Sequence, residues 1–176
     1  MMLKLGICAG VTLLAVTVFS VYMGAWCTVK IVEREEGPFL FVYRTVPGID
    51  QRKIGAVTSE LYNVLTRAGI QDVRPLDVFH PSAENVPNEI GFEVPVAQAT
   101  KLASAEGYYQ KTIPRRRYMT TTFPFRNRLS FMVAYVKVDP ALNSYRQRKA
   151  YRSAWAMARN DGETITYFQP AVPATP

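Results

Sequence analysis

The hydrophobic positions at the start of the chain form one unbroken run. No charged residue occurs from Leu5 to Cys27, and Lys4 and Lys30 stand on either side of this stretch. A helix of this length would be about 34 Å long, and the hydrocarbon core of a bilayer is roughly 30 Å thick. The pattern therefore predicts an uncleaved, single-pass transmembrane anchor within residues 1–29.

A secretory signal peptide is the alternative for this stretch. Its apolar part would span only ~7–15 residues and would end at a small-x-small cleavage site. The best candidate site begins with Met23, which is not a small residue, so the anchor is favoured. Lys4 on one side faces Lys30 and Arg34 on the other, and this balance leaves the orientation open. The bacterial inner membrane and the endoplasmic reticulum both fit the pattern, and the side on which the domain lies is open.

Beyond residue 29, short runs of alternating or β-branched residues between turn residues predict strands. The first half of this region is expected to contain the strands Lys30–Glu36, Phe39–Val46, Leu76–His80 and Glu89–Val94. A helix is predicted between Asp50, which can cap it, and Gly69, which can end it. The apolar residues that mark one face of this helix are Ile54, Val57, Leu61, Val64, Leu65 and Ala68.

The second half shows the same succession of patterns. Its predicted strands are Tyr108–Ile113, Tyr118–Phe123, Ala150–Ala158 and Thr164–Gln169. Leu129, Met132, Val133 and Val136 mark an amphipathic helix, and Asp139-Pro140 predicts the start of a second helix that ends near Lys149. A short helix at Val96–Glu106 is expected to join the two halves.

The order strand-strand-helix-strand-strand thus occurs twice. This duplication predicts an α+β fold with internal pseudo-two-fold symmetry, built from repeats at about residues 30–95 and 108–170. The domain would span residues 30–170, and residues 171–176 would form a short tail. A ligand is expected in the cleft where the two halves meet.

The charge is unevenly distributed along the domain. The chain carries a net charge of +7, yet residues 31–110 hold 7 basic and 11 acidic residues, whereas residues 111–152 hold 11 basic residues and one acidic residue. Anionic lipid headgroups or an acidic protein are the expected partners of the basic half, and nucleic acid is the less favoured one. A solvated face that keeps the domain soluble is the simpler alternative. The predicted contact residues are Arg115, Arg116, Arg117, Arg146, Arg148 and Lys149.

The sequence offers little catalytic chemistry. It has no nucleophile elbow, P-loop, zinc-protease or dinucleotide-binding motif. Both cysteines, Cys8 and Cys27, lie in the amino-terminal stretch, and His80 is the only histidine, so neither a disulfide nor a zinc site is expected in the domain. We therefore expect a domain without enzymatic activity, metal or cofactor.

Aromatic residues are the more promising material for a binding site, although most of them are expected to serve core packing. Tyrosine and tryptophan carry a polar group that favours a partly wet surface. The residues predicted to line the cleft are Tyr43, Tyr118, Trp155, Met157 and Tyr167.

The second half also carries a family resemblance, in the segment Thr120–Lys149. Together with the duplicated repeat, this segment resembles the GyrI-like small-molecule-binding family. An anchor followed by such a domain is similar to the arrangement in a testis-expressed, single-pass ER-phagy receptor that carries a GyrI-like domain. The residues that carry the resemblance are Thr122-Phe123-Pro124, Leu129-Ser130, Asp139-Pro140-Ala141-Leu142 and Tyr145.

The chain departs from the family pattern at one strand. In the family that the chain resembles, domains that bind cationic drugs typically carry a glutamate in a Leu-Glu-Ile-Tyr strand. In this chain that strand is residues 154–158, which contain no acidic residue. A buried cation without a carboxylate partner is costly. The resemblance therefore implies a non-catalytic domain that binds a small apolar or anionic ligand, or a protein partner, near the bilayer. The alternative is an adaptor that docks on anionic lipid or an acidic protein through its basic half.

Overall fold

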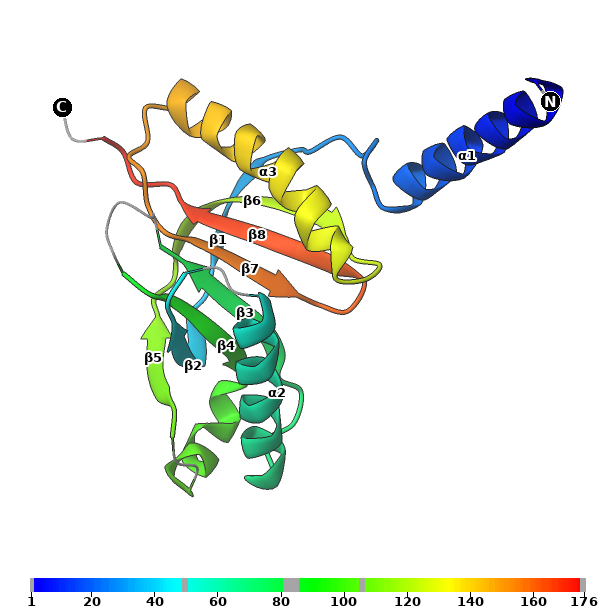
Figure 1. The fold of residues 1–176 in the computed structure, drawn as a ribbon. Coiled ribbons are helices and arrows are strands. Elements are labelled where there is room, and N and C mark those ends of the chain that lie inside the picture. The colour runs from blue at the N-terminus through cyan, green and yellow to red at the C-terminus, as the bar shows by residue number, and fades with distance from the viewer. Residues whose placement is uncertain (1, 49–50, 81–85, 105–106, 175–176) are drawn as a thin grey trace.

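The computed structural model describes residues 2–48, 51–80, 86–104 and 107–174 (Figure 1). Within these residues, a helix, α1, precedes a domain of eight strands, two long helices and one 3₁₀ helix, η2. In chain order the elements are α1 (Met2–Tyr22), β1 (Val32–Glu36), β2 (Phe39–Val46), α2 (Gln51–Arg67), β3 (Arg74–Phe79), β4 (Asn88–Val94), η2 (Val96–Ser104), β5 (Tyr109–Ile113), β6 (Arg116–Pro124), α3 (Leu129–Arg148), β7 (Ala156–Asn160) and β8 (Thr164–Pro170).

The strands form a single antiparallel sheet whose order reflects the duplication. The order is β1-β6-β8-β7-β3-β4-β2-β5. The counterparts in the two repeats are β1 and β5, β2 and β6, β3 and β7, and β4 and β8. Replacing each strand by its counterpart gives the same order, read from the opposite edge of the sheet. The central pair, β3 and β7, joins the two halves, with Asp77 opposite Ala158 and Val78 opposite Met157. This arrangement is the one expected of two β-β-α-β-β repeats around a pseudo-two-fold axis.

Two short connections force the sheet to curl. β1 lies at one edge and β2 lies next to the opposite edge, yet only Gly37 and Pro38 connect them. Pro114 and Arg115 connect β5 to β6 in the same way. The two connections cross closely: a Cβ on Gly37, whose φ is +91°, would lie 3.3 Å from the Cα of Arg115. Closing both connections brings the two edges of the sheet toward each other and makes one face concave.

The long helices cover the other face of the sheet, and Figure 1 shows α2 beside β3 and β4 and α3 beside β8. On this face, α2 contributes Leu61 and Leu65 to one buried apolar cluster. The buried residues that α3 contributes to a second cluster are Ala134, Val138 and Leu142. A third buried cluster lies on the concave face and is formed by strand residues. The domain is therefore an α+β fold in which both long helices pack on one face of a curled sheet and the other face is concave.

The helix α3 differs from the prediction. It runs without interruption from Leu129 to Arg148 with Pro140 inside it, whereas the sequence predicted a second helix starting at Pro140. Proline removes the hydrogen bond to the carbonyl four residues earlier, here that of Val136. Val136 is 71% exposed, so its carbonyl lies on the solvent side of the helix, where water can satisfy it.

Strand β7 also differs, because it begins at Ala156 and not at Ala150. The backbone N–H groups of Ala150 and Tyr151 donate to the carbonyls of Gln147 and Arg146 at the end of α3. Ala150 adopts a left-handed conformation with a φ of 51°. The backbone N–H groups of Ala150 and Tyr151 are thus used to end the helix and are not available to β7. Residues 150–155 therefore form the connection between α3 and β7.

The amino-terminal helix meets the domain through the turn that follows it. Met23 is buried, and Lys137 on α3 donates to the carbonyl of Cys27 at 2.6 Å. Side chains of α1 from Leu13 to Tyr22 are largely exposed. In the described part of the chain, no helix combines the length and the apolar character that crossing a membrane requires. The transmembrane anchor predicted within residues 1–29 is thus not supported by the structure.

Candidate functional site

The concave face of the sheet carries an aromatic cluster built from both repeats. The ring of Phe39 on β2 lies 6.5 Å from that of Tyr118 on β6 and 5.9 Å from that of Phe168 on β8. Four strands separate β2 from β6 within the sheet, so the curl brings these rings together. Two aromatic residues at the margin, Tyr43 and Trp155, are only partly buried. The buried members of the cluster are Phe39, Phe41, Leu76, Val78, Ile113, Tyr118, Met157 and Phe168.

Four of the five predicted cleft residues belong to this cluster. Tyr118 and Met157 are buried in it, and Tyr43 and Trp155 pack against it. Tyr167 does not: it packs with the cluster under α3, on the opposite face of the sheet. Successive residues of a strand point to opposite faces, and Tyr167 precedes the concave-face residue Phe168. The structure therefore separates Tyr167 from the other four.

A lysine and a glutamate stand at one side of the cluster. The Nζ of Lys111 on β5 lies 2.6 Å from Oε1 of Glu89 on β4. It also lies 5.0 Å from the ring centroid of Tyr43 and 5.9 Å from that of Phe41. These two rings are stacked, with centroids 5.0 Å apart. Burial, and then the negative charge of Glu89, raise the pKa of the Tyr43 hydroxyl.

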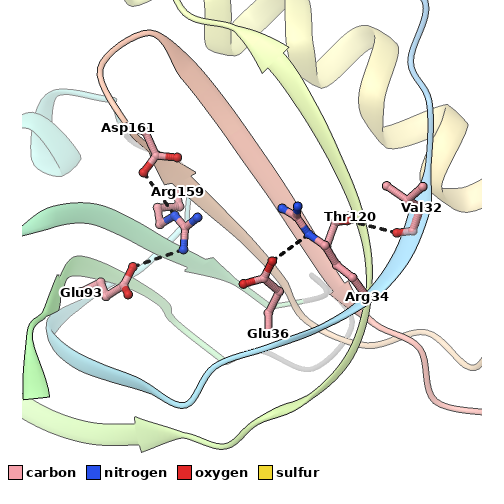
Figure 2. A network of polar contacts seen from close by, with 7 residues as sticks. All are labelled: Val32, Arg34, Glu36, Glu93, Thr120, Arg159 and Asp161. Carbon is pink, nitrogen blue, oxygen red and sulfur yellow. Dashed lines mark hydrogen bonds and ion pairs between the residues drawn. The ribbon is translucent and has the colours of Figure 1, made fainter.

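A second charged group lies at the other end of the same face. In Figure 2, Arg159 on β7 lies between Glu93 on β4 and Asp161 in the following turn. Its Nη1 is 3.4 Å from Oε2 of Glu93, and its Nε is 3.3 Å from Oδ1 of Asp161. The guanidinium also lies 5.2 Å from the ring centroid of Phe168. This arginine links the two repeats across the central pair of strands.

Other basic groups of the face belong to the β1–β6 side. The guanidinium of Arg116 lies 5.8 Å from the ring centroid of Trp155. Arg34 is bound to Glu36 at 2.7 Å, and Thr120 donates to the carbonyl of Val32 at 3.0 Å, as Figure 2 shows. Burial raises the pKa of the Tyr118 hydroxyl to about 12, against a smaller lowering effect of Arg116.

Sequence analysis did not assign Lys111, Glu89, Glu93 and Arg159 to a site. The spacing of the two glutamates is a signal that could have found them. Glu89, Gly91 and Glu93 are two residues apart along one predicted strand, so they lie on the same face of the sheet. Lys111 and Arg159 gave no such signal, because their partners lie on β4. This strand is separated from β5 by β2 and from β7 by β3, so the contacts depend on the strand order of the folded sheet.

An open hollow of about 440 Å³ lies where the two repeats meet, between the start of β3 and the turn after β7. It is next to Arg159, since Asn160 and Asp161 form part of its wall. The five predicted cleft residues do not line it. Its lining residues are Val73, Arg74, Pro75, Asn160, Asp161 and Gly162. The hollow therefore lies beside Asp161, the partner of Arg159, whereas the buried members of the aromatic cluster are at most 4% exposed and only the margin of the cluster reaches solvent.

The predicted basic contact residues converge at one end of α3. Arg148 and Lys149 lie over the ring of Tyr145, whose hydroxyl donates to Glu33 on β1 at 3.1 Å. Arg117 lies 4.0 Å from the same Glu33. Arg115 pairs with Glu35 at 3.0 Å, Arg146 donates to Asn143, and Arg116 belongs to the concave face. Most of these residues therefore form one surface with acidic residues of the first repeat.

The described side chains include no group of three or more His, Cys, Asp or Glu residues that could hold a metal ion.

Comparisons with known proteins rest on structure, because no family model and no curated protein sequence matches the chain. EcmrR in an EcmrR–DNA complex is similar with a TM-score of 0.62 and 10% identity over 97% of this chain and 70% of that one. The EcmrR C-terminal domain gives a TM-score of 0.56 and 11% identity over 83% and 99%. SAV2435 bound to tetraphenylphosphonium gives 0.57 and 14% over 80% and 93%.

These similarities support the fold of the domain. The curled sheet with its helices matches the GyrI-like fold that the resemblance implied. Identities of 10–14% show the fold and leave the ligand of this chain open. The likeness to an ER-phagy receptor is not shown by these structures and stays a prediction.

Proposed function

We propose that the domain is a non-catalytic receptor that binds a small apolar or anionic molecule on its concave face. The observation that carries the proposal is the aromatic cluster that both repeats build there, with a partly exposed margin at Tyr43 and Trp155. Pockets for small molecules are mostly apolar and aromatic, with a few polar groups that orient the ligand. The fold shared with SAV2435, which binds tetraphenylphosphonium, adds support.

The charges around the cluster favour an anion over a cation. Lys111 and Arg116 lie over the rings at the margin of the cluster, Tyr43 and Trp155, and Arg159 lies over the buried ring of Phe168. The two carboxylates of β4 are already paired, Glu89 with Lys111 and Glu93 with Arg159. An aromatic acid could therefore stack on the rings and place its carboxylate beside a basic group, at no cost of an unpaired buried charge.

A non-catalytic role fits the same pairing. A general acid or base needs a protonation state that can change at the working pH, close to the atom that reacts. Glu89 and Glu93 are each engaged in an ion pair with a basic side chain, at 2.6 and 3.4 Å, so neither carboxylate is free to act on a substrate.

Fluorescence of Trp155 tests the proposal. The chain has two tryptophans, so a Trp26→Phe variant reports on Trp155 alone. Titration with a library of apolar compounds and aromatic acids should change the Trp155 emission for at least one compound. Tyr43→Ala should weaken binding of that compound about tenfold or more, because truncation removes a ring from the site. The matched control is Tyr62→Ala, since Tyr62 is an exposed tyrosine of α2 that packs on Phe92, on the helix-covered face of the sheet. Equal effects of both substitutions would contradict the proposal.

The second candidate function is an adaptor that docks on anionic lipid or an acidic protein. It is favoured by the surface at the end of α3, where Arg117, Arg148 and Lys149 gather around Glu33 and Tyr145. Each basic residue close to an anionic membrane contributes about 1 kcal/mol. Replacing Arg117, Arg148 and Lys149 by glutamate in a chain that starts at Thr28 should abolish co-sedimentation with vesicles that contain phosphatidylserine. Unchanged sedimentation would argue against this candidate.

Membrane tethering through the amino-terminal stretch belongs to the same proposal. Its support is the charge-free sequence from Leu5 to Cys27 and the exposed apolar side chains of α1, such as Leu13 and Phe19. The full chain should stay with membranes after alkaline extraction, whereas a chain that starts at Thr28 should be released. Release of both would contradict tethering. Reporter fusions at both ends would then give the side of the membrane.

A further inference from the structure

The ammonium group of Lys111 lies over two aromatic rings of the concave face, those of Phe41 and Tyr43. Register places Lys111 on β5 directly opposite Phe41 on β2. From there its ammonium reaches over the Tyr43 ring, at 5.0 Å, to Glu89 at 2.6 Å. We call Phe41, Tyr43 and Glu89 the Glu89 cage. It has the composition of sites that recognise ammonium ligands: stacked ring faces and a carboxylate.

Burial makes this cage selective. The Glu89 side chain is 11% exposed, so its charge is largely removed from water and needs a cation beside it. Lys111 is 37% exposed and belongs to an edge strand of the sheet. The carboxylate is thus fixed in the sheet, and its partner is a long side chain on a strand that has a neighbour on one side only. A second cation at the same carboxylate would meet the charge of Lys111 at close range.

The other repeat repeats this arrangement in part. Arg34 on the edge strand β1 lies opposite Tyr118, as Lys111 lies opposite Phe41. Its carboxylate partner is Glu36, on its own strand, at 2.7 Å. A basic residue beside a concave-face aromatic is therefore found at both edges of the sheet, but the partner of Lys111 is a buried glutamate on β4, which is separated from β5 by β2.

We propose that Lys111 is the specificity-determining residue of the concave face. Its ammonium occupies the Glu89 cage as a built-in cation, so the domain rejects organic cations and accepts neutral or anionic molecules. Removing the amine while keeping the apolar stem would convert the cage into a cation site. This inference rests on the proposed function, since it assumes that small molecules reach the concave face.

Two ions of equal shape and opposite charge test the inference. Tetraphenylphosphonium and tetraphenylborate differ in the charge of their central atom, so the ratio of their dissociation constants cancels non-specific apolar binding, including binding to α1. Isothermal titration of the full chain should give a lower dissociation constant for the borate. In Lys111→Met, the ratio of the phosphonium constant to the borate constant should fall at least about tenfold, a difference of about 1.4 kcal/mol. Lys111→Gln, which can still donate to Glu89, should change the ratio in the same direction and serves if the methionine variant is unstable.

Control variants make the result specific to the cage. Lys149→Met removes another lysine that lies over a tyrosine ring, at 5.9 Å from Tyr145, but outside the concave face, and should leave the ratio unchanged. Lys111→Arg keeps the charge and should keep the wild-type ratio. Adding Glu89→Gln to Lys111→Met should restore most of the ratio, because the carboxylate is then neutral.

The inference is overturned if the ratio in Lys111→Met stays within about twofold of wild type, or if Lys149→Met changes it equally. It is also overturned if neither ion binds any variant, because there is then no cation site from which Lys111 could exclude a ligand. In that case the Trp155 titration still decides whether the concave face binds other molecules, so the two proposals can fail separately.

Discussion

Asp77 is a partly buried carboxyl on the central strand β3, between the concave-face residues Leu76 and Val78. Alternation directs it to the helix-covered face, where its charge acts on Tyr167. Burial raises the pKa of Asp77 to about 7, although a hydrogen bond from the backbone of Gly91 lowers it. The pKa of a carboxyl in an unfolded chain is about 3.9. The folded protein therefore binds this proton more tightly, and the resulting stability is complete below about pH 4 and is lost as the pH rises through 7.

Asp77→Asn should remove this pH dependence. At pH 8 the variant should be more stable than wild type, by up to about 4 kcal/mol, because each unit of pKa difference corresponds to about 1.4 kcal/mol. At pH 4 the two proteins should have similar stability. Urea unfolding at both pH values measures the difference. A variant that is equally destabilised at pH 4 and pH 8 would contradict the account.

Gly91 permits the close approach of β4 and β2 next to Tyr43. A Cβ at Gly91 would lie 2.0 Å from the carbonyl oxygen of Val42 and 2.8 Å from the Cα of Tyr43, so backbone would have to move. Gly91→Ala should destabilise the domain by about 1–3 kcal/mol. Gly55→Ala in α2, where a Cβ meets no atom within 4 Å, should stabilise it by about 0.5–1 kcal/mol. Equal denaturation midpoints for the two variants would disprove this reading.

At the scale of elements, one carboxylate oxygen fixes the end of α3 to the sheet. The hydroxyls of Tyr145 and Tyr151 donate to Oε1 of Glu33 on β1 at 3.1 and 3.0 Å. Burial and these hydrogen bonds raise the pKa of both tyrosines. The carboxylate thus joins α3, the segment after it and an edge strand.

Tyr145→Phe and Tyr151→Phe should each cost about 1 kcal/mol in unfolding free energy, since each removes one hydrogen bond to a charged group. The double variant should show a coupling of at least about 0.5 kcal/mol, because both hydroxyls share one oxygen. Tyr135→Phe is the control: Tyr135 is an exposed residue of the same helix, and its change should stay within about 0.5 kcal/mol. A control that costs as much as Tyr145→Phe would contradict the account.

Local sequence patterns predicted the elements well where the cause was local. The alternating and β-branched runs predicted the strands, and helical spacing from Ile54 to Ala68 predicted α2. The predictions were wrong where the surroundings decided. Pro140 continues α3 because its lost hydrogen bond faces solvent, and the start of β7 is delayed by the hydrogen bonds that end α3. Neither cause is visible in a window of a few residues.

At the scale of the whole molecule, the folded sheet explains the uneven charge. The acidic first half and the basic second half meet where β1 pairs with β6, with Glu35 opposite Arg117 and Glu36 opposite Arg116. Part of the charge asymmetry therefore serves to pair the two repeats. The duplication could be predicted from the order of elements, but the contact of Lys111 with Glu89 could not, because it depends on the strand order of the sheet.

The curl of the sheet sets the two faces of the domain apart, and two buried methionines distinguish them. Met157 belongs to the concave-face cluster, and Met119 belongs to the cluster under α3. Both are fully buried, while Met132 on α3 is exposed. Methyl NMR of the methionine-labelled chain, titrated with a ligand found through Trp155 fluorescence, compares these positions in one experiment. The account predicts a chemical-shift change at Met157 and a nuclear Overhauser contact between its methyl group and the ligand, with Met119 and Met132 nearly unchanged. Shifts at Met119 or Met132 with Met157 unchanged would contradict binding on the concave face.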